Sequence, residues 1–327
     1  MIAFVRHAAL LLFAAAVAPA FPGASHAQEK FPSRPITLIN PWSPGGPVDI
    51  HFRALAAQME KILGQPVVVE SKPGAGGTLG PATVAATAKP DGYTLTEIPV
   101  GLFSVPAMQK VSFDPAKDFT YIIHLTSYRF VTLVRADSPW KTWKELVAYG
   151  KEHPRELRYG STGAGGALHL GMEEIASLAG FKMTHVPFKG ASEQVAALLG
   201  EHVQVVPTGG LAVQLIEANQ ARPLLFWTKA KNPRFPDVPT LTDEGIDPAL
   251  DPSSPYGIGG PKNMDPKIVR ILHDAIKQAS ETPEVRQVLE QIQQDYTYMN
   301  SEDYTAYALK QIGASKALVE RLGLAKQ

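Results

Sequence analysis

The chain of 327 residues contains no cysteine. This absence excludes a disulfide scaffold, a cysteine zinc site, an iron–sulfur cluster and a cysteine nucleophile. It also excludes the lipid attachment site of a lipoprotein. Basic and acidic side chains are balanced at 31 each. A neutral chain argues against nucleic acid as the main partner, because that binding depends on a basic surface.

Long apolar runs are also missing. A helix that crosses a bilayer needs about 18 or more apolar residues, and no stretch reaches that length. The chain instead starts with Arg6, a short apolar run at Ala8–Val17, and small residues at Ser25 and Ala27. This pattern is typical of a secretory signal peptide, with an uncleaved membrane anchor as the alternative. It predicts a signal peptide over residues 1–27 and a soluble, exported, periplasmic protein.

Sequence signatures of catalysis and cofactor binding are absent as well. There is no G-x-S-x-G elbow, no Walker loop and no H-E-x-x-H pair, and the nine histidines do not cluster. Gly74, Gly76 and Gly80 resemble a dinucleotide loop, but the third glycine comes one residue late. We therefore expect no catalytic residue, no metal and no cofactor.

Short apolar runs alternate with helical patterns through most of the chain. Ile36–Asn40 is typical of a strand, and Asp49–Leu63 has the 3.6-residue apolar period of a helix. Such alternation predicts an α/β fold with parallel-rich sheets covered on both faces. After a strand at Tyr256–Gly260 the pattern indicates only helices.

Three glycine-rich turns each follow a predicted strand and precede a predicted helix. They span residues 41–49, 72–77 and 160–166. The N-terminus of a helix offers free N–H groups and a positive dipole end, so it attracts anions. Each turn alone can simply be a tight turn. Three of them in one α/β chain favour a ligand site, because ligands gather at the carboxyl ends of parallel strands.

The candidate ligand-binding residues come from two of these turns, from the helix after the third, and from later strand ends. They are Trp42, Ser43, Gly45, Gly46, Asp49, Ser161, Thr162, Gly163, Gly165, Gly166, His169, Phe188, Lys189, Gly190, Thr208 and Tyr256. For Asp49 a role in shaping its loop is favoured over ligand contact, and His169 is more often packed than a ligand contact at such a position. For Arg129 a solvated side chain is favoured over pairing with a carboxylate, and Trp227 is expected to lie in the core.

Several ordered motifs run through essentially the whole mature chain, among them Pro44-Gly45-Gly46-x-x-Asp49, Pro73-Gly74-Ala75-Gly76-Gly77, Pro90-Asp91-Gly92-Tyr93-Thr94-Leu95 and His185-Val186-Pro187-Phe188-Lys189-Gly190. This set resembles the Bug family, the substrate-binding proteins of tripartite tricarboxylate transporters. The resemblance implies a two-domain periplasmic protein that closes around a small carboxylate. It also implies that backbone amides of the glycine-rich loops hold the carboxylate, and that a large and a small integral membrane protein are the partners.

The sequence departs from the family pattern at four places. Phe188 replaces a common Tyr, Val206–Gly210 replaces a segment that often carries Asp or Asn, Pro255–Gly257 differs from the frequent Trp-Phe-Gly, and Tyr128–Phe130 is bulkier than usual. The fold and the loop chemistry therefore carry over from the family, but the identity of the ligand does not.

Together these features predict a type II periplasmic binding fold and a monomer. One domain is expected to comprise residues 28–127 and 255–327, and the other residues 128–254, with a ligand cleft between them. The expected ligand is a dicarboxylate, a tricarboxylate or an aromatic carboxylate. Two alternatives are a hydrolytic enzyme that uses Ser161 with a base such as His169, and a ligand sensor without a transporter.

Overall fold

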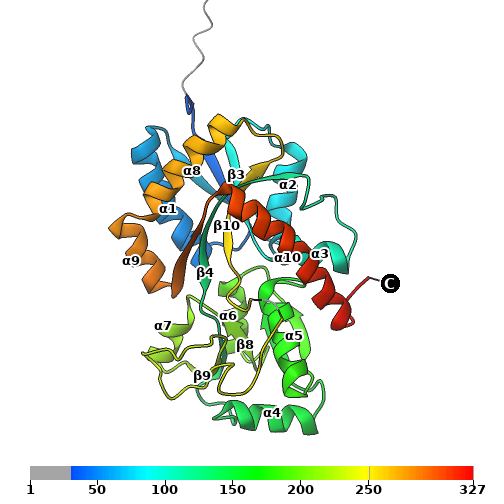
Figure 1. Ribbon diagram of the computed structural model, residues 1–327. Coiled ribbons are helices and arrows are strands. Elements are labelled where there is room, and N and C mark those ends of the chain that lie inside the picture. Colours follow the sequence, from blue (N-terminus) through cyan, green and yellow to red (C-terminus); the bar gives the residue numbers. More distant parts are fainter. Residues whose placement is uncertain (1–30, 250, 327) are drawn as a thin grey trace, which may run out of the picture. The chain divides into compact units, whose positions relative to one another are not determined.

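The computed structural model describes residues 31–249 and 251–326, and Phe31–Gln327 forms one compact unit (Figure 1). The predicted signal peptide, with its cleavage site before Gln28, lies outside the described residues. None of the helices in the described part combines the length and the apolar character that crossing a bilayer requires.

The larger sheet has six strands in the order β11-β4-β10-β3-β1-β2. β1 is parallel to β2 and β3, whereas β10 is antiparallel to β3 and β4, and β11 is antiparallel to β4. The strands are β1 (Ile36–Asn40), β2 (Val67–Ser71), β3 (Thr94–Ile98), β4 (Phe119–Tyr128), β10 (Tyr256–Pro261) and β11 (Gln294–Met299). A segment from late in the chain, β10, therefore lies in the middle of the sheet.

Six helices and one short 3₁₀ turn accompany this sheet (Figure 1). They are α1 (Pro47–Leu63), the 3₁₀ turn η1 (Ala75–Gly77), α2 (Leu79–Thr87), α3 (Gly101–Met108), α8 (Pro266–Ser280), α9 (Pro283–Gln291) and α10 (Ser301–Arg321). The predicted apolar face of α1 is buried: Phe52, Leu55 and Met59 lie in one core cluster with Leu272 and Ile276 of α8. Burial of such side chains contributes roughly 1.5–3 kcal/mol each and holds α1 on the sheet.

The remaining strands form two smaller sheets. β5 (Val131–Arg135) lies between β8 (Val206–Thr208) and β9 (Ala221–Phe226), antiparallel to both, and β6 (Arg158–Ser161) is parallel to β7 (Thr184–Pro187). Their helices are α4 (Trp143–Glu152), α5 (Ala167–Ala179), α6 (Ala191–Leu199) and α7 (Ala212–Glu217). Trp227 is buried here and donates to Thr132 Oγ1 over 2.8 Å, which confirms the expectation of a core tryptophan.

Two elements were missed by the sequence patterns. β11, Gln294–Met299, is a strand where only helices were expected, and α3, Gly101–Met108, was not predicted. β11 is an edge strand of which only Gln294 is buried, so its apolar signal is weak. α3 begins with a glycine and contains Pro106, two residues that disfavour helices. Burial of Leu102, Phe103 and Val105 forms the helix in spite of them.

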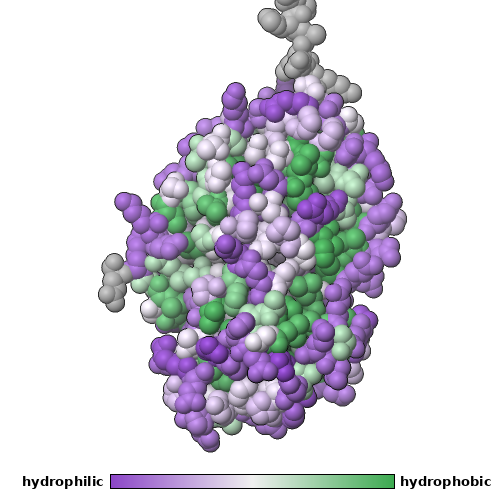
Figure 2. Space-filling view, turned by 180° about the vertical axis from the view of Figure 1, so that it is seen from behind, coloured by the Kyte–Doolittle hydropathy of each residue, from purple (hydrophilic) through white to green (hydrophobic). Residues whose placement is uncertain are grey.

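The outer surface mixes polar and apolar residues (Figure 2). The large hydrophobic side chains that are exposed among the described residues are Val68, Leu79, Leu178, Ile271, Tyr298 and Leu309. They lie on six different elements, so no single described element presents several of them together.

Candidate functional site

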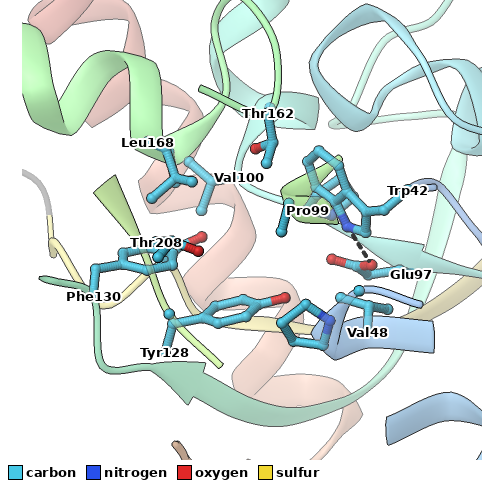
Figure 3. Close-up of a pocket in the computed structure, with 17 residues that line it drawn as sticks. Trp42, Val48, Glu97, Pro99, Val100, Tyr128, Phe130, Thr162, Leu168 and Thr208 are labelled. Carbon is cyan, nitrogen blue, oxygen red and sulfur yellow. Dashed lines mark hydrogen bonds between the residues drawn. The ribbon is translucent and has the colours of Figure 1, made fainter. Parts of the chain in front are cut away.

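A cavity of about 60 Å³ lies beneath the predicted glycine-rich turns (Figure 3). One water molecule needs roughly 10–15 Å³ measured in this way, so the cavity holds a few waters or a small ligand. The polar or aromatic side chains that line it include Trp42, Glu97, Tyr128, Phe130, Thr162 and Thr208. Trp42 and Glu97 precede the connection between β4 and β5 in the sequence, and Thr162 and Thr208 follow it. The cavity therefore depends on segments that are far apart in sequence.

The first turns of four helices also line this cavity. Pro47 and Val48 begin α1, Gly101 begins α3, Ala167 and Leu168 begin α5, and Ala191 begins α6. Each helix start has backbone N–H groups without a partner inside the helix and carries the positive end of the helix dipole. Four such ends at one cavity make it attractive to an anion although no described lining residue is basic.

The turn before α1 is held by Asp49. This buried carboxylate accepts hydrogen bonds from the Gly45 amide at 3.1 Å and from Arg53 Nε at 2.9 Å. Burial raises the pKa of Asp49, but these hydrogen bonds and the Arg53 charge outweigh burial and lower its pKa below the ordinary value. Gly45 has a φ of +77°, which favours glycine. Asp49 thus shapes the loop, as favoured from the sequence, and Gly46 is left at the cavity wall.

Glu97 was not among the predicted site residues. It is the penultimate residue of the buried strand β3, is 1% exposed, and lines the cavity. Its Oε2 accepts a hydrogen bond from Trp42 Nε1 over 2.8 Å, the dashed line in Figure 3. Burial raises the pKa of Glu97 from its ordinary value of 4.5 to about 8, because no cation compensates the charged form. An acidic residue inside a strand that is predicted to be buried is the sequence signal that could have identified it.

The raised pKa of Glu97 predicts a pH-dependent stability difference between the wild-type protein and Glu97→Gln. Between about pH 4.5 and 8 the folded state keeps a proton that the unfolded chain has lost, so wild-type stability falls as the pH rises through this window. Glutamine does not titrate. We expect the melting temperature of the variant, relative to wild type, to rise steadily from pH 5 to pH 8 and then level off. A difference that is constant from pH 5 to pH 9 in calorimetric scans would contradict this.

The aromatic wall of the cavity comes from the β4–β5 connection. The rings of Tyr128 and Phe130 stack with centroids 4.9 Å apart. Their bulk was noted from the sequence, but they were not proposed as site residues. Arg129 between them forms two hydrogen bonds with Asp295, one of them 2.9 Å from Nε, so the alternative of pairing with a carboxylate is the one that the structure shows, in a side chain that is still 42% exposed.

Ser161 and two histidines stabilise the third glycine-rich turn. Ser161 Oγ lies 2.6 Å from His185 Nε2, and His169 Nδ1 accepts a hydrogen bond from the Gly165 amide at 3.0 Å. The two imidazoles stack with centroids 4.0 Å apart. Burial lowers the pKa of His169 to about 4, and burial together with His169 lowers that of His185 to about 3. The histidine beside Ser161 is thus His185 and not His169, and Ser161 is fully buried.

The second and third glycine-rich turns pack on each other. A Cβ added at Gly163 would lie 2.7 Å from Gly76 Cα, and one at Gly76 would lie 2.4 Å from the Ala164 carbonyl oxygen. A Cβ at Gly165 would lie 2.7 Å from Val105 Cγ2 of α3. Close approach between chain segments accounts for these glycines, which do not line the cavity.

A third contact joins the turn before α1 to the turn before α6. Ser43 Oγ donates to Glu193 Oε1 at 2.9 Å, and the Lys189 amide donates to Glu193 Oε2 at 3.1 Å. A Cβ at Gly190 would lie 2.9 Å from the Ser43 backbone nitrogen. These residues hold two loops together at the cavity, whereas the Lys189 side chain is exposed.

The structure therefore divides the sequence-predicted candidates into two groups. Four of them line the cavity: Trp42, Gly46, Thr162 and Thr208. The others lie in the surrounding loops and core: Ser43, Gly45, Asp49, Ser161, Gly163, Gly165, Gly166, His169, Phe188, Lys189, Gly190 and Tyr256. In the second group, Tyr256 is buried and donates to Gln294 Oε1 at 2.8 Å. Within the described part of the chain, no three His, Asp or Glu side chains are grouped as metal ligands.

Comparisons with known proteins agree on one family. The family model described as tripartite tricarboxylate transporter family receptor matches residues 51–324. The curated relative "UPF0065 protein in gbd 5'region" of Cupriavidus necator is 44% identical over 323 residues, covering 99% of this chain and 98% of the relative.

Solved structures show the same likeness. The periplasmic binding protein BugD superposes with a TM-score of 0.84 and 27% identity, covering 91% of this chain and 100% of BugD. An R. palustris protein solved with adipate gives a TM-score of 0.83 and 26% identity, covering 90% and 99%. These matches confirm the predicted periplasmic binding fold and the resemblance to the Bug family.

Proposed function

Because the chain belongs to the tripartite tricarboxylate transporter receptor family, we propose that it captures a small organic carboxylate for transport across the inner membrane. Members of this family are solute-binding receptors and not enzymes. The proposal adds three points to the family assignment. The ligand is an organic acid, backbone amides hold its carboxylate, and the integral membrane subunits of a tripartite transporter receive it.

The observation that carries this proposal is the meeting of four helix N-termini at one cavity. The starts of α1, α3, α5 and α6 all line it, and none of the described lining side chains is basic. An anion bound there would be held by N–H groups and helix dipoles. The solved relative with adipate is a further support, because adipate is a carboxylate.

A melting-temperature screen tests the ligand class. A ligand that binds only the folded protein stabilises it by about 2.7 kcal/mol at a hundredfold excess over its dissociation constant. For a chain of this size that raises the melting temperature by roughly 5–10 °C. We expect such a shift with at least one acid in a panel of aliphatic and aromatic carboxylates, and not with its neutral amide. Shifts produced by sugars or cationic amino acids but by no acid would refute the proposal.

Ligand capture by closure of two domains is part of the same proposal. The six-stranded sheet takes its strands from residues 36–128 and 256–299, and the smaller sheets take theirs from residues 131–226. This distribution supports the division into residues 28–127 with 255–327 and residues 128–254. Hinge bending at the two crossings would open the cavity. Solution scattering with and without the stabilising acid measures the closure as a decrease in the radius of gyration.

The location in the periplasm rests on the signal peptide over residues 1–27. N-terminal sequencing of the exported protein checks this point and should begin at Gln28. The hydrolase alternative has little support, since Ser161 is fully buried and bonded to His185. A sensor without a transporter would bind its ligand in the same way, and loss of acid uptake on deletion of the gene would separate the two roles.

A further inference from the structure

The cavity contains one acidic side chain, and its second oxygen has no hydrogen-bond partner in the structure. Glu97 Oε2 accepts from Trp42 Nε1, while no described residue donates to Glu97 Oε1. The carboxyl group faces the cavity between Trp42 and Tyr128 (Figure 3). Glu97 is 1% exposed, so a further hydrogen bond to this oxygen has to come from water or a ligand inside the cavity.

A second polar group in the same cavity lacks a partner. Thr208 is 1% exposed, and its Oγ1 makes no hydrogen bond in the structure. Thr208 comes from β8 and Glu97 from β3, so the two groups belong to different sheets. Apolar side chains, among them Val48, Val100 and Leu168, complete the wall. The cavity thus combines an apolar interior with two polar groups that require a hydrogen-bonding ligand.

The described lining residues include no lysine, arginine or histidine. The helix N-termini provide the attraction for one carboxylate. Above about pH 8, where Glu97 is ionised, a second carboxylate beside it would place two like charges together in a buried site without a cation, which is unfavourable. A hydroxyl group is both donor and acceptor, so it can pair with Glu97 whether or not Glu97 carries a proton.

We propose that Glu97 determines specificity and that the ligand is a small monocarboxylic acid with an uncharged, hydroxyl-type group at its far end. The far group pairs with Glu97 and Thr208, and Glu97 disfavours dicarboxylates. This inference rests on the proposed function, since it takes for granted that the cavity binds an organic acid. It narrows the ligand class of the proposed function, which did not distinguish dicarboxylates from monocarboxylates.

Matched acids of equal chain length test the inference by titration calorimetry on the mature protein at about pH 9, where Glu97 is ionised. One set is pentanoate, 5-hydroxypentanoate and glutarate, and the other is hexanoate, 6-hydroxyhexanoate and adipate. We expect the hydroxy acid to bind tightest in at least one set. The methyl-ended acid should bind about tenfold to 100-fold more weakly, because it leaves buried polar groups unpaired. The diacid should be the weakest of the three.

Two variants locate the preference at Glu97. Glu97→Gln keeps hydrogen-bonding atoms without a charge, so we expect it to keep the preference for the hydroxy acid and to bind the diacid better than wild type does. Glu97→Leu has no hydrogen-bonding atoms, so the hydroxy acid should lose its advantage over the methyl-ended acid. Ratios of affinities are compared, because a general loss of structure would weaken all three acids alike. Melting curves establish that each variant is folded, and if Glu97→Leu is not, Glu97→Gln decides.

The possible results separate this inference from the proposed function. Tightest binding of glutarate or adipate by the wild-type protein would overturn the inference and leave the proposed function standing. An unchanged hydroxyl preference in Glu97→Leu, or an unchanged diacid penalty in Glu97→Gln, would also overturn it. If no acid of any class binds to a folded wild-type protein, the proposed function fails, and the inference fails with it.

Discussion

Gly46→Val is expected to weaken acid binding by at least about 100-fold while the protein stays folded. Gly46 lines the cavity at the start of α1, where the proposed carboxylate would meet backbone N–H groups. An amide cannot be deleted by substitution, but a branched side chain at the wall bars the ligand from it. A 100-fold loss corresponds to about 2.7 kcal/mol. Calorimetric affinity for the acid found in the melting-temperature screen is the measurement.

The local geometry allows this substitution. The φ and ψ of Gly46 are −81° and 171°, which any residue adopts, and an added Cβ would lie 3.5 Å from the Ser43 carbonyl oxygen, an ordinary contact. Valine is a poorer N-cap than glycine, so we expect a modest stability loss of about 1 kcal/mol. Gly313→Val is the control, because a Cβ at this glycine of α10 has no neighbour within 4 Å. Wild-type affinity in a normally melting Gly46→Val variant would show that the acid does not bind at this loop.

Gly163→Ala is expected to destabilise the folded protein by about 2–4 kcal/mol. Gly163 has a φ of +122°, a conformation that strains a residue with a Cβ, and the added carbon would lie 2.7 Å from Gly76 Cα and 2.8 Å from Gly76 N. Both contacts are to backbone, so one of the two loops must move. For a chain of this size the melting temperature should fall by roughly 5–15 °C.

Gly64→Ala is the matched control for this prediction. Gly64 ends α1 with a φ of +69°, and an added Cβ there would have no neighbour within 4 Å. Alanine at this position therefore destabilises the protein by about 1 kcal/mol through the positive φ, without a steric clash. Equal losses of melting temperature in the two variants would mean that the contact between the two glycine-rich turns contributes nothing to stability.

Most helices and strands of this chain could be predicted because burial of one face leaves a periodic pattern of apolar residues in the sequence. The strand limits predicted for Ile36–Asn40 agree with the structure, and the helix expected at Asp49–Leu63 begins two residues earlier, at Pro47. Edge strand β11 lacked this pattern because only Gln294 of its six residues is buried, and α3 lacked it because Gly101 and Pro106 oppose a helix locally.

The residues of the candidate site could be predicted only in part, for a different reason. Glycine-rich turns indicate close approach of something to the backbone, but they do not say whether a ligand or another chain segment approaches. At Gly46 the neighbour is the cavity, whereas at Gly163 and Gly165 it is Gly76 and Val105. Glu97, Tyr128 and Phe130 were missed because each lies on or next to a strand and reads as structural until the opposite wall of the cavity is known.

The sequence by itself determined the family, the α/β fold and the position of the loops that begin α1 and α5, since these depend on local patterns and ordered motifs. Tertiary structure alone decided which residues share the cavity. Separate parts of the chain meet there, among them those of Trp42, Glu97, Tyr128, Thr162 and Thr208, because β1, β3 and β4 belong to one sheet and the starts of α5 and α6 pack against its loops. Long-range packing of this kind joins segments that have no periodic relation along the chain, so no local pattern could reveal it.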